Sequence, residues 1–310
     1  MVKIYFKAIM FFIILISFFY FYHMDDVYTT NTFIAVDKSS SLLKKIEAEA
    51  DKYKENPDDA YIDKVWKKTP GRDGKKVNIH KSYENMQEKN KFSEERLVFD
   101  KIPPKVTMDD LPAAPIYRGH PKKSMTALLI NVSWGEEHIP NMLNILKEQN
   151  VKATFFIEGK WAKENKNIVK MIEEQGHLIG NHGFNHPDMA KMTDQQIREQ
   201  IIETNDIIEA IIGEKPKWFA PPSGSFNDKV VKVADQEDMD TILWTVDTID
   251  WQKPSVSVMI NRVMSNIHPG ATILMHPTTS VVQGLEQLIV EIKEQDLKLH
   301  TIEELLKETR

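Results

Sequence analysis

The sequence predicts an α/β fold, a distorted parallel (β/α)7 barrel, preceded by a polar stalk with a membrane anchor. From residue 124 onward, short apolar segments alternate with amphipathic segments of helical periodicity. Residues 24–123 are polar and rich in lysine, and residues 8–22 form an uncharged apolar run. A doubly wound open sheet is the alternative that the same alternation allows.

The strands and helices expected in residues 124–310 follow one another in sequence. Thr193 and Gln196 form a capping box at the start of the longest helix, and Gly176 and Gly213 lie where helices commonly end. The expected strands are residues 127–131, 154–157, 178–181, 218–220, 241–246, 271–275 and a last one at Leu299. The expected helices are residues 139–149, 167–175, 194–212, 228–238, 255–266, 285–295 and one after Leu299.

The part of the chain before the barrel is predicted to contain an anchor at residues 1–23 and a stalk at residues 24–123. Apolar residues at helical spacing predict a helix at 41–55, and turn signals surround a short strand at 77–79. The favoured interpretation is a spacer with a small accessory fold. A contact with a wall or a protein partner is the alternative.

The composition fits a folded protein and excludes several functions. Of the 310 residues, 41% are hydrophobic, which is enough for a sizeable core. Lys+Arg count 40 against 46 for Asp+Glu, a net charge of −6. A general nucleic-acid binder is therefore not expected, because it would need a basic surface. The absence of cysteine excludes disulfides, thiolate metal ligands and a cysteine nucleophile.

The N-terminus has the features of an export signal. Lys3 and Lys7 precede the apolar run at residues 8–22, and Asp25 and Asp26 follow it. This order of charges predicts an N-terminus in the cytoplasm and the rest of the chain outside, at the cell membrane. No small-residue cleavage site follows the run, so an uncleaved anchor is favoured. The alternative is a cleaved signal, which would make the protein secreted.

In a barrel of this kind, functional residues gather at the C-terminal ends of the strands. His182 and His186 directly follow one strand and can converge on a divalent metal ion such as zinc. His276 ends another strand and fits an acid–base imidazole with a carboxylate partner. Roles without a catalytic or binding function stay open as alternatives. The histidines could be surface or loop residues, and Asp247 and Asp250 could cap a helix.

Four longer segments resemble the polysaccharide deacetylase family, also called the NodB-homology or carbohydrate esterase family 4 fold. The resemblance covers roughly residues 125–306. The order of an apolar N-terminus, a polar stalk and a C-terminal barrel resembles most the sporulation-associated YlxY-type members of that family. The four segments are residues 151–165, 176–189, 212–224 and 242–251.

The resemblance implies a metal-dependent deacetylase that removes N-acetyl groups from peptidoglycan or chitin-like sugars. In that family one Asp and two His hold the metal, and His182 and His186 match the two histidines. A second Asp is the general base, and a late His protonates the leaving amine. His276 matches the late histidine, with Asp250 as its orienting carboxylate. The residues expected to contact the glycan are Trp251, Pro221, Pro222, Ser223 and Trp134.

The chain departs from the family pattern where the family has its two Asp residues and an Arg. Ser133 stands in the place of the base and Trp134 in the place of the metal ligand. Ala220 replaces the Arg that orients the base. Serine needs an activator to take a proton, and a catalytic zinc site needs three protein ligands. We therefore expect a divalent metal, zinc in the first place, to bind weakly.

Three functions are compatible with this pattern. The first is an active deacetylase in which Glu136, Glu137 or Asp247 replaces the lost ligand or base. The second is a degenerate family member that binds wall glycan without hydrolysing it. The third is a scaffold protein of the cell envelope. Turnover with tight metal binding would support the first, and glycan retention without turnover would support the second.

Overall fold

The computed structural model describes residues 41–310. The predicted anchor at residues 1–23 lies outside the described residues. Within residues 41–310, no helix is both long enough and apolar enough to cross a membrane. The described chain divides into two compact units, residues 41–56 with 74–102 and residues 57–73 with 103–310.

The first unit is small and has its own core. Residues 41–50 are helical and continue as a turn of 3₁₀ helix, η1 (Asp51–Tyr53). The strands β3 (Gly74–Val77) and β4 (Phe99–Ile102) pair antiparallel. Helix α2 (Ile79–Met86) and the short η2 (Glu94–Arg96) lie between them in sequence. The core of this unit consists of Leu42, Ile46, Val77 and Met86.

The short strand predicted at residues 77–79 is placed too late. The strand ends at Val77, because Asn78 caps helix α2 by accepting a hydrogen bond from the backbone N–H of Lys81 at 2.9 Å. An asparagine side chain in this position satisfies a backbone donor of the first helical turn. The chain therefore changes from strand to helix at Asn78.

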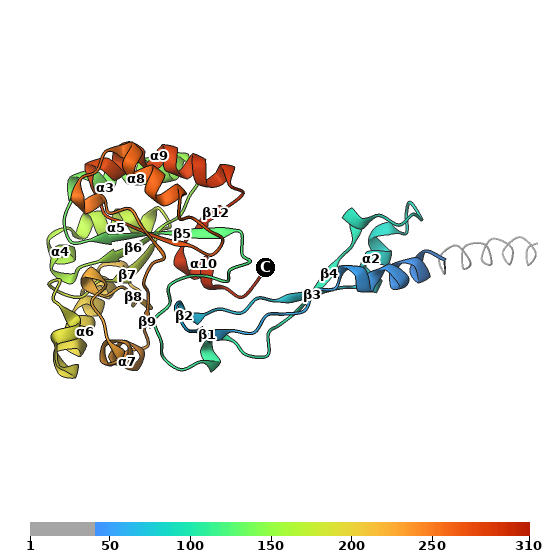
Figure 1. The fold of residues 1–310 in the computed structure, drawn as a ribbon, viewed down its shortest axis with the longest axis horizontal. Coiled ribbons are helices and arrows are strands. Elements are labelled where there is room, and N and C mark those ends of the chain that lie inside the picture. The colour runs from blue at the N-terminus through green and yellow to red at the C-terminus, as the bar shows by residue number, and fades with distance from the viewer. Residues whose placement is uncertain (1–40) are drawn as a thin grey trace, which may run out of the picture. The chain divides into compact units, whose positions relative to one another are not determined.

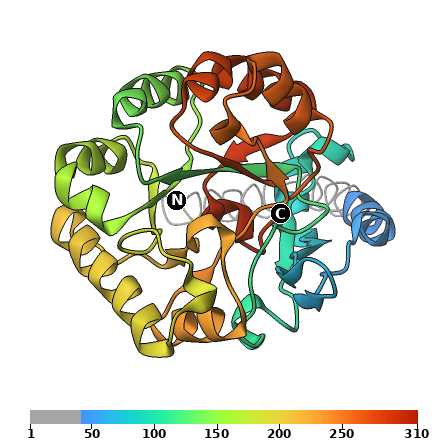
Figure 2. The same cartoon turned by 60° about the vertical axis from the view of Figure 1, so that its left-hand side comes forward.

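The second unit contains one parallel sheet, which confirms the predicted α/β class. Its strand order is β10-β11-β5-β6-β7-β8-β9, with β12 also paired to β5. The two ends of this path, β9 and β10, are not paired with each other in the described chain, so the sheet is a half-barrel and not a closed ring (Figure 2). The strands are β5 (Met125–Val132), β6 (Thr154–Ile157), β7 (Leu178–Asn181), β8 (Trp218–Phe219), β9 (Asp240–Thr241), β10 (Val246–Asp247), β11 (Thr272–Met275) and β12 (Lys298–His300).

The single strand predicted at residues 241–246 is wrong. Thr241 ends β9 and pairs with Phe219 of β8, whereas Val246 begins β10 and pairs with Ile273 of β11. The chain therefore passes from one end of the strand path to the other within a few residues. A mostly apolar run without glycine or proline does not reveal such a crossing, because both of its halves are largely buried.

Helices surround the strands of the second unit, as Figures 1 and 2 show. Helix α6 has the predicted bounds and the predicted capping box of Thr193 with Gln196. Helix α9 begins at Thr279, six residues before the predicted start at residue 285, and α4 was not predicted. The helices are α3 (Ile139–Glu148), α4 (Gly159–Glu164), α5 (Lys166–Glu174), α6 (Asp194–Ile212), α7 (Asp228–Gln236), α8 (Val256–Met264), α9 (Thr279–Glu294) and α10 (Ile302–Leu306).

Strand β5 separates two layers of the core. Leu128 and Ile130 belong to the cluster formed with the outer helices. Leu129, between them, belongs to a second cluster that includes Leu305 of α10. Successive side chains of a strand point to opposite faces, so β5 is apolar on both sides. Helix α10 therefore fills the inside of the half-barrel, and the ends of the strands are left for polar residues.

Residues 57–73 complete the second unit. They form the antiparallel hairpin of β1 (Tyr61–Asp63) and β2 (Lys67–Thr69). The backbone N–H of Gly71 and that of Met108 both donate to the Glu308 carboxylate, at 2.9 and 3.1 Å. This carboxylate ties the C-terminal segment to the hairpin.

Candidate functional site

The predicted site residues come from the C-terminal ends of β5, β7 and β11 and from the turns after β8 and β10. Contacts between them connect these ends. Trp134 follows β5 and stacks on His276, which follows β11. His182 follows β7 and binds the carbonyl of Ala220, which follows β8. The structure thus brings together the side chains that the sequence placed at separate strand ends.

Asp250 and His276 form the best-connected part of the site. Asp250 is fully buried, and the hydroxyls of Thr248 and Thr278 donate to its two oxygens at 2.7 and 2.9 Å. The backbone N–H of His276 donates to Oδ2 at 3.1 Å, and the ring Nδ1 of His276 lies 3.0 Å from Oδ1. Because a carboxylate only accepts hydrogen bonds, Nδ1 carries a proton in this contact.

This network has a clear electrostatic effect. Burial by itself would raise the pKa of Asp250. The hydrogen bond and charge of His276, together with the two threonine hydroxyls, outweigh burial and hold the pKa of Asp250 below its usual value. Asp250 is therefore a carboxylate at neutral pH, and it fixes the orientation of the His276 ring.

Two tryptophans are exposed at the site. Trp134 is 46% exposed, and its ring lies parallel to that of His276, at an angle of 10° and a centroid distance of 6.0 Å. Trp251 is 54% exposed and follows Asp250. Exposed tryptophans offer a large apolar face together with an N–H donor. Such side chains suit the binding of a ligand that has both apolar and hydrogen-bonding surfaces.

His182 and His186 lie side by side, with ring centroids 5.2 Å apart. Nδ1 of His182 donates to the carbonyl of Ala220 at 2.8 Å, so its Nε2 has a free lone pair. Burial, and then the neighbouring His186, lower the pKa of His182 to about 3. Burial also lowers the pKa of His186. Both imidazoles are therefore neutral near pH 7, as metal ligands must be.

The donor set nevertheless does not fit a tightly bound divalent metal. In residues 41–310, no group of three or more His, Asp and Glu side chains is placed to hold a metal ion. Trp134, at the end of β5, offers no ligand atom, because its indole nitrogen is a donor only. Two imidazoles remain, one fewer than a catalytic zinc site uses.

The carboxylates that could have replaced the missing ligand interact elsewhere. Glu136 accepts a hydrogen bond from the indole N–H of Trp161 at 3.3 Å. Glu137 is exposed and lies 3.5 Å from the ring of His138. Asp247 accepts the backbone N–H of Ile249 at 2.8 Å. The structure thus brings none of the three into a metal-binding group with the histidines.

Ser133 lies beside a carboxylate that the sequence did not reveal. Glu158 follows β6 and is 8% exposed. Burial raises the pKa of Glu158, and the nearby hydroxyl of Ser133 has a smaller effect in the opposite direction. The Oδ1 atom of Asn131, two residues before Ser133, is buried without a hydrogen-bond partner among the described residues. The Oγ atom of Ser133 is also buried without a hydrogen-bond partner among the described residues, so the end of β5 has polar atoms that are not fully satisfied.

The segment after β8 follows the prediction in position and differs in exposure. Pro221 and Pro222 are buried, and Pro222 packs against Gly183 in the loop of residues 182–187, which we call the histidine loop. Ser223 is exposed and has a left-handed backbone with φ of 53°. Backbone strain of this kind, about 1 kcal/mol for a residue that is not glycine, is often found at functional sites. Ser223 is therefore the residue of this segment that is free to meet a ligand.

Sequence analysis missed the residues that support the site. Thr248 and Thr278 hold Asp250, and each lies two residues from a predicted catalytic residue, Asp250 and His276. Asn181 ends β7 and accepts the backbone N–H of Gly183 at 2.7 Å. Their proximity in sequence to the motifs was the available signal. The sequence does not show which polar side chains near the motifs point into the site, because this depends on tertiary packing.

Comparison with known proteins places this site in a family. Residues 118–242 match the model of the family described as polysaccharide deacetylase. The protein YlxY of Bacillus subtilis is 51% identical over 87% of this chain and 84% of its own length. A peptidoglycan-N-acetylglucosamine deacetylase of Bacillus cereus is 36% identical over 60% of this chain and 70% of its own.

Solved structures give the same grouping. BA3943 of Bacillus anthracis, described as a CE4 family pseudoenzyme, is 50% identical, covers 86% of this chain and 95% of its own, and superposes with a TM-score of 0.82. A mutant of BA3943, described as having restored enzymatic activity, is 48% identical, with 86% of this chain and 98% of its own covered and a TM-score of 0.82.

Proposed function

Because the chain belongs to the polysaccharide deacetylase family, we propose that it is a catalytically degenerate member that binds cell-wall glycan without removing its acetyl groups. The observation that carries the proposal is the end of β5. Ser133 and Trp134 stand there, and the described residues offer no third ligand to His182 and His186. Metal-assisted hydrolysis needs a metal-bound water and a base, and this arrangement supplies neither well.

The similarity to BA3943 supports this reading. That protein is described as a pseudoenzyme, and a mutant of it as having regained activity. A protein that has lost the catalytic activity but has kept the fold would still have a surface that fits the ligand of the family. In this chain that surface includes Trp134, which stacks on the fixed ring of His276, and the exposed Trp251.

The glycan is proposed from the relatives. Those similar to this chain include deacetylases named for N-acetylglucosamine and for N-acetylmuramic acid of peptidoglycan. A sugar ring of this kind has an apolar face that can stack on an indole and an acetamide that can accept a hydrogen bond. Peptidoglycan, or a polymer of N-acetylglucosamine, is therefore the proposed ligand of the strand-end site. We use this name for the residues at the strand ends described above, namely Trp134, His182, His186, Ser223, Asp250, Trp251 and His276.

Metal-dependent deacetylation is the second candidate function. The neighbouring rings of His182 and His186 and the contact between Asp250 and His276 support this candidate, because the resemblance assigns metal-binding and acid roles to these residues. Under this candidate the protein would use weakly bound zinc. We propose instead that the two imidazoles alone bind zinc too weakly for turnover, because a ligand is missing.

One set of measurements tests both candidates. The unchanged protein should release no acetate from tetra-N-acetylglucosamine or peptidoglycan with added Zn²⁺ or Co²⁺, yet should sediment with insoluble peptidoglycan. The double variant Ser133→Asp, Trp134→Asp should release acetate and retain zinc through dialysis, because it regains a base and a ligand. His276→Ala in that background should abolish the release.

Three outcomes would contradict the proposal. Acetate release by the unchanged protein that disappears in His276→Ala would establish an active deacetylase. Failure to sediment with peptidoglycan would remove the glycan-binding role and leave the scaffold interpretation. Stoichiometric zinc in the unchanged protein after dialysis would show that our view of the metal is wrong.

We also propose that the protein is located at the cell membrane, with the deacetylase-like domain outside the cytoplasm. The support is the order of Lys3 and Lys7, the apolar run at residues 8–22 and the acidic residues after it. A role in sporulation rests only on the resemblance to YlxY-type members. Membrane fractionation, followed by protease treatment of intact protoplasts, tests the location, since an external domain should be degraded.

A further inference from the structure

A polar hollow lies at the end of the sheet opposite to the strand-end site. It has a volume of about 420 Å³ and is bordered by the residues just before β7 and β8 and by those that follow β12. An adjoining hollow of about 380 Å³ shares Trp218 and Glu303 with it. Together they form a groove, called here the lower groove, in which Trp218 and Glu303 border both halves. Volumes of this size are typical of ligand sites.

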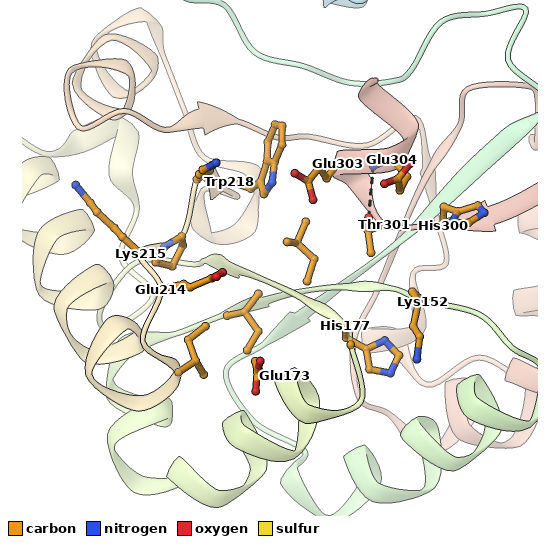
Figure 3. Close-up of a pocket in the computed structure, with 16 residues that line it drawn as sticks. Lys152, Glu173, His177, Glu214, Lys215, Trp218, His300, Thr301, Glu303 and Glu304 are labelled. Atoms are coloured by element: carbon orange, nitrogen blue, oxygen red, sulfur yellow. Dashed lines mark hydrogen bonds between the residues drawn. The ribbon is translucent and has the colours of Figure 1, made fainter. Parts of the chain in front are cut away.

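Trp218 is placed as a binding platform. It packs against the core cluster that contains Ile116 and Ile242, yet it remains partly exposed. Leu178, Ile179 and Ile212 give the first hollow an apolar floor. Figure 3 shows Trp218 across the hollow from Glu173, with apolar side chains between them. A rigid indole beside a small apolar floor favours a ligand that has a flat apolar face.

His177 supplies a buried donor that has no acceptor. Its side chain is 5% exposed, and Nδ1 accepts the backbone N–H of Ala153 at 3.1 Å. Burial, and then the charge of Lys152, lower the pKa of His177 to about 4, so the ring is neutral and its proton is on Nε2. Within the described chain Nε2 has no hydrogen-bond partner. An unpaired buried donor is energetically unfavourable, and His177 is one of the residues that line the first hollow.

Charged groups surround the apolar floor. Figure 3 shows Lys152 and His177 on one side of the first hollow and Glu214 and Lys215 on the opposite side. Carboxylates outnumber ammonium groups along the lower groove. The carboxylates are Glu173, Glu214, Glu303, Glu304, Asp109, Asp240 and Glu308, and the ammonium groups are Lys152, Lys215, Lys217 and Lys307.

These features limit the class of ligand. The excess of carboxylates disfavours anionic polymers, because like charges repel at short range. Carboxylates accept hydrogen bonds from hydroxyl groups, and the Lys152 ammonium can donate to an oxygen. A groove that continues on both sides of one indole suits a chain that extends beyond one ring. A glycan without acidic groups has all of these properties.

We propose that the lower groove is a second glycan-binding site, which holds a sugar chain free of anionic groups across Trp218. It is separate from the strand-end site, and it does not depend on that site being functional. A domain with a sugar site at each end of its sheet could connect two glycan strands, and binding to a polymer would gain from the joint engagement of both sites.

Tryptophan resonances can report on the two sites separately. The full chain is labelled with ¹⁵N-tryptophan, and its six indole N–H signals are assigned by single Trp→Phe variants. Tetra-N-acetylglucosamine is then titrated. The proposal expects the Trp218 signal to shift with a saturable dependence on sugar concentration. An oligogalacturonate of the same length, which is anionic, should shift it at least fivefold less at equal concentration.

A matched pair of variants tests the groove without removing the indole. Glu303→Ala changes a residue that borders both hollows, and Glu294→Ala changes an exposed glutamate on α9. Glu303→Ala should weaken binding at Trp218 at least fivefold, and Glu294→Ala by less than twofold. Signals of Trp134 and Trp251 should respond equally in both variants.

The outcomes separate this inference from the proposed function. Shifts at Trp134 and Trp251 with none at Trp218 would overturn the lower groove and leave the strand-end site. Shifts at Trp218 alone would support the lower groove and count against the strand-end site. An equal response of Trp218 to the anionic oligomer, or an equal effect of both glutamate variants, would also overturn the proposal.

Discussion

Asp250 determines how His276 is presented at the site. The carboxylate accepts hydrogen bonds from two threonine hydroxyls and from the backbone N–H of His276, and it meets the ring Nδ1. All of its hydrogen-bonding capacity is thus used inside the protein. The His276 ring in turn forms one partner of the Trp134 stack. A single buried carboxylate therefore supports the exposed aromatic surface.

We predict that Asp250→Asn lowers the free energy of unfolding by about 2–3 kcal/mol at pH 7. The amide has only one acceptor oxygen, so at least one donor around it stays unpaired in a buried place. Urea denaturation measures the loss. Asp247→Asn is the control, because Asp247 is less buried and accepts from one backbone N–H, and it should cost less than about 1 kcal/mol. Equal costs would contradict the role given to Asp250.

Gly135 permits the close approach of the β5 and β11 ends. Its φ is 83°, and a Cβ atom built on it would lie 2.3 Å from the carbonyl oxygen of Pro277. Gly213 has the same φ of 83°, but a Cβ atom there would meet no atom of residues 41–310 within 4 Å. The two glycines therefore separate the cost of a left-handed backbone from the cost of a clash.

We expect Gly135→Ala to lower the free energy of unfolding by more than about 3 kcal/mol, and Gly213→Ala by only about 1–2 kcal/mol. The additional loss at Gly135 comes from the clash with Pro277. Displacement of Trp134 from His276 should accompany it and would be visible as a change in tryptophan fluorescence. Similar losses in the two variants would show that the approach to Pro277 is unimportant.

At the scale of elements, strand β7 and helix α6 hold the histidine loop. Asn181 ends β7 and is fully buried. Its Nδ2 donates to the Ile201 carbonyl at 2.9 Å and to Asn205 Oδ1 at 2.8 Å, while its Oδ1 accepts from Gly183. One side chain therefore joins the strand, the helix and the loop that carries His182.

Asn181→Ala should destabilise the protein by about 2–4 kcal/mol, because several buried polar groups lose their partner together. Urea denaturation measures this. We also expect faster amide hydrogen exchange in the histidine loop, since Gly183 loses its contact. Asn266→Ala is the control, because Asn266 is exposed and its side chain donates to the carbonyl of Arg262. If Asn181→Ala lowered the free energy of unfolding by no more than Asn266→Ala, other contacts would have to hold the histidine loop.

Elements with strong end signals could be predicted closely from the sequence. Residues 154–157, 178–181 and 194–212 have the predicted bounds, the last because Thr193 and Gly213 mark its two ends. The run at residues 241–246 could not be assigned correctly, because no turn residue marks where the chain leaves β9. In the site, the histidines and Asp250 followed from motifs. The stack of Trp134 on His276 and the position of Glu158 depend on packing between distant strands.

On the scale of the whole molecule, buried histidines connect stability to pH. Burial lowers the pKa of both His120 and His177 to about 4, and that of His182 to about 3. In the unfolded chain these side chains have a pKa of about 6.5. Between pH 6.5 and 4 the unfolded state therefore binds more protons than the folded state.

We predict that the free energy of unfolding is highest above pH 6.5 and decreases as the pH falls toward 4. At pH 5 each such histidine contributes a loss of about 2 kcal/mol relative to pH 7. Asp250 does not take part in this decrease. Its pKa is lowered in the folded protein, so its contribution to the free energy of unfolding is lost only below about pH 4. Urea midpoints at pH 7 and pH 5, measured with EDTA present, test this.

His177→Asn should remove about 2 kcal/mol of the decrease, since an amide does not titrate and can still accept from Ala153. The prediction would be contradicted if the change in the free energy of unfolding between pH 7 and pH 5 were the same in the unchanged protein and in His177→Asn.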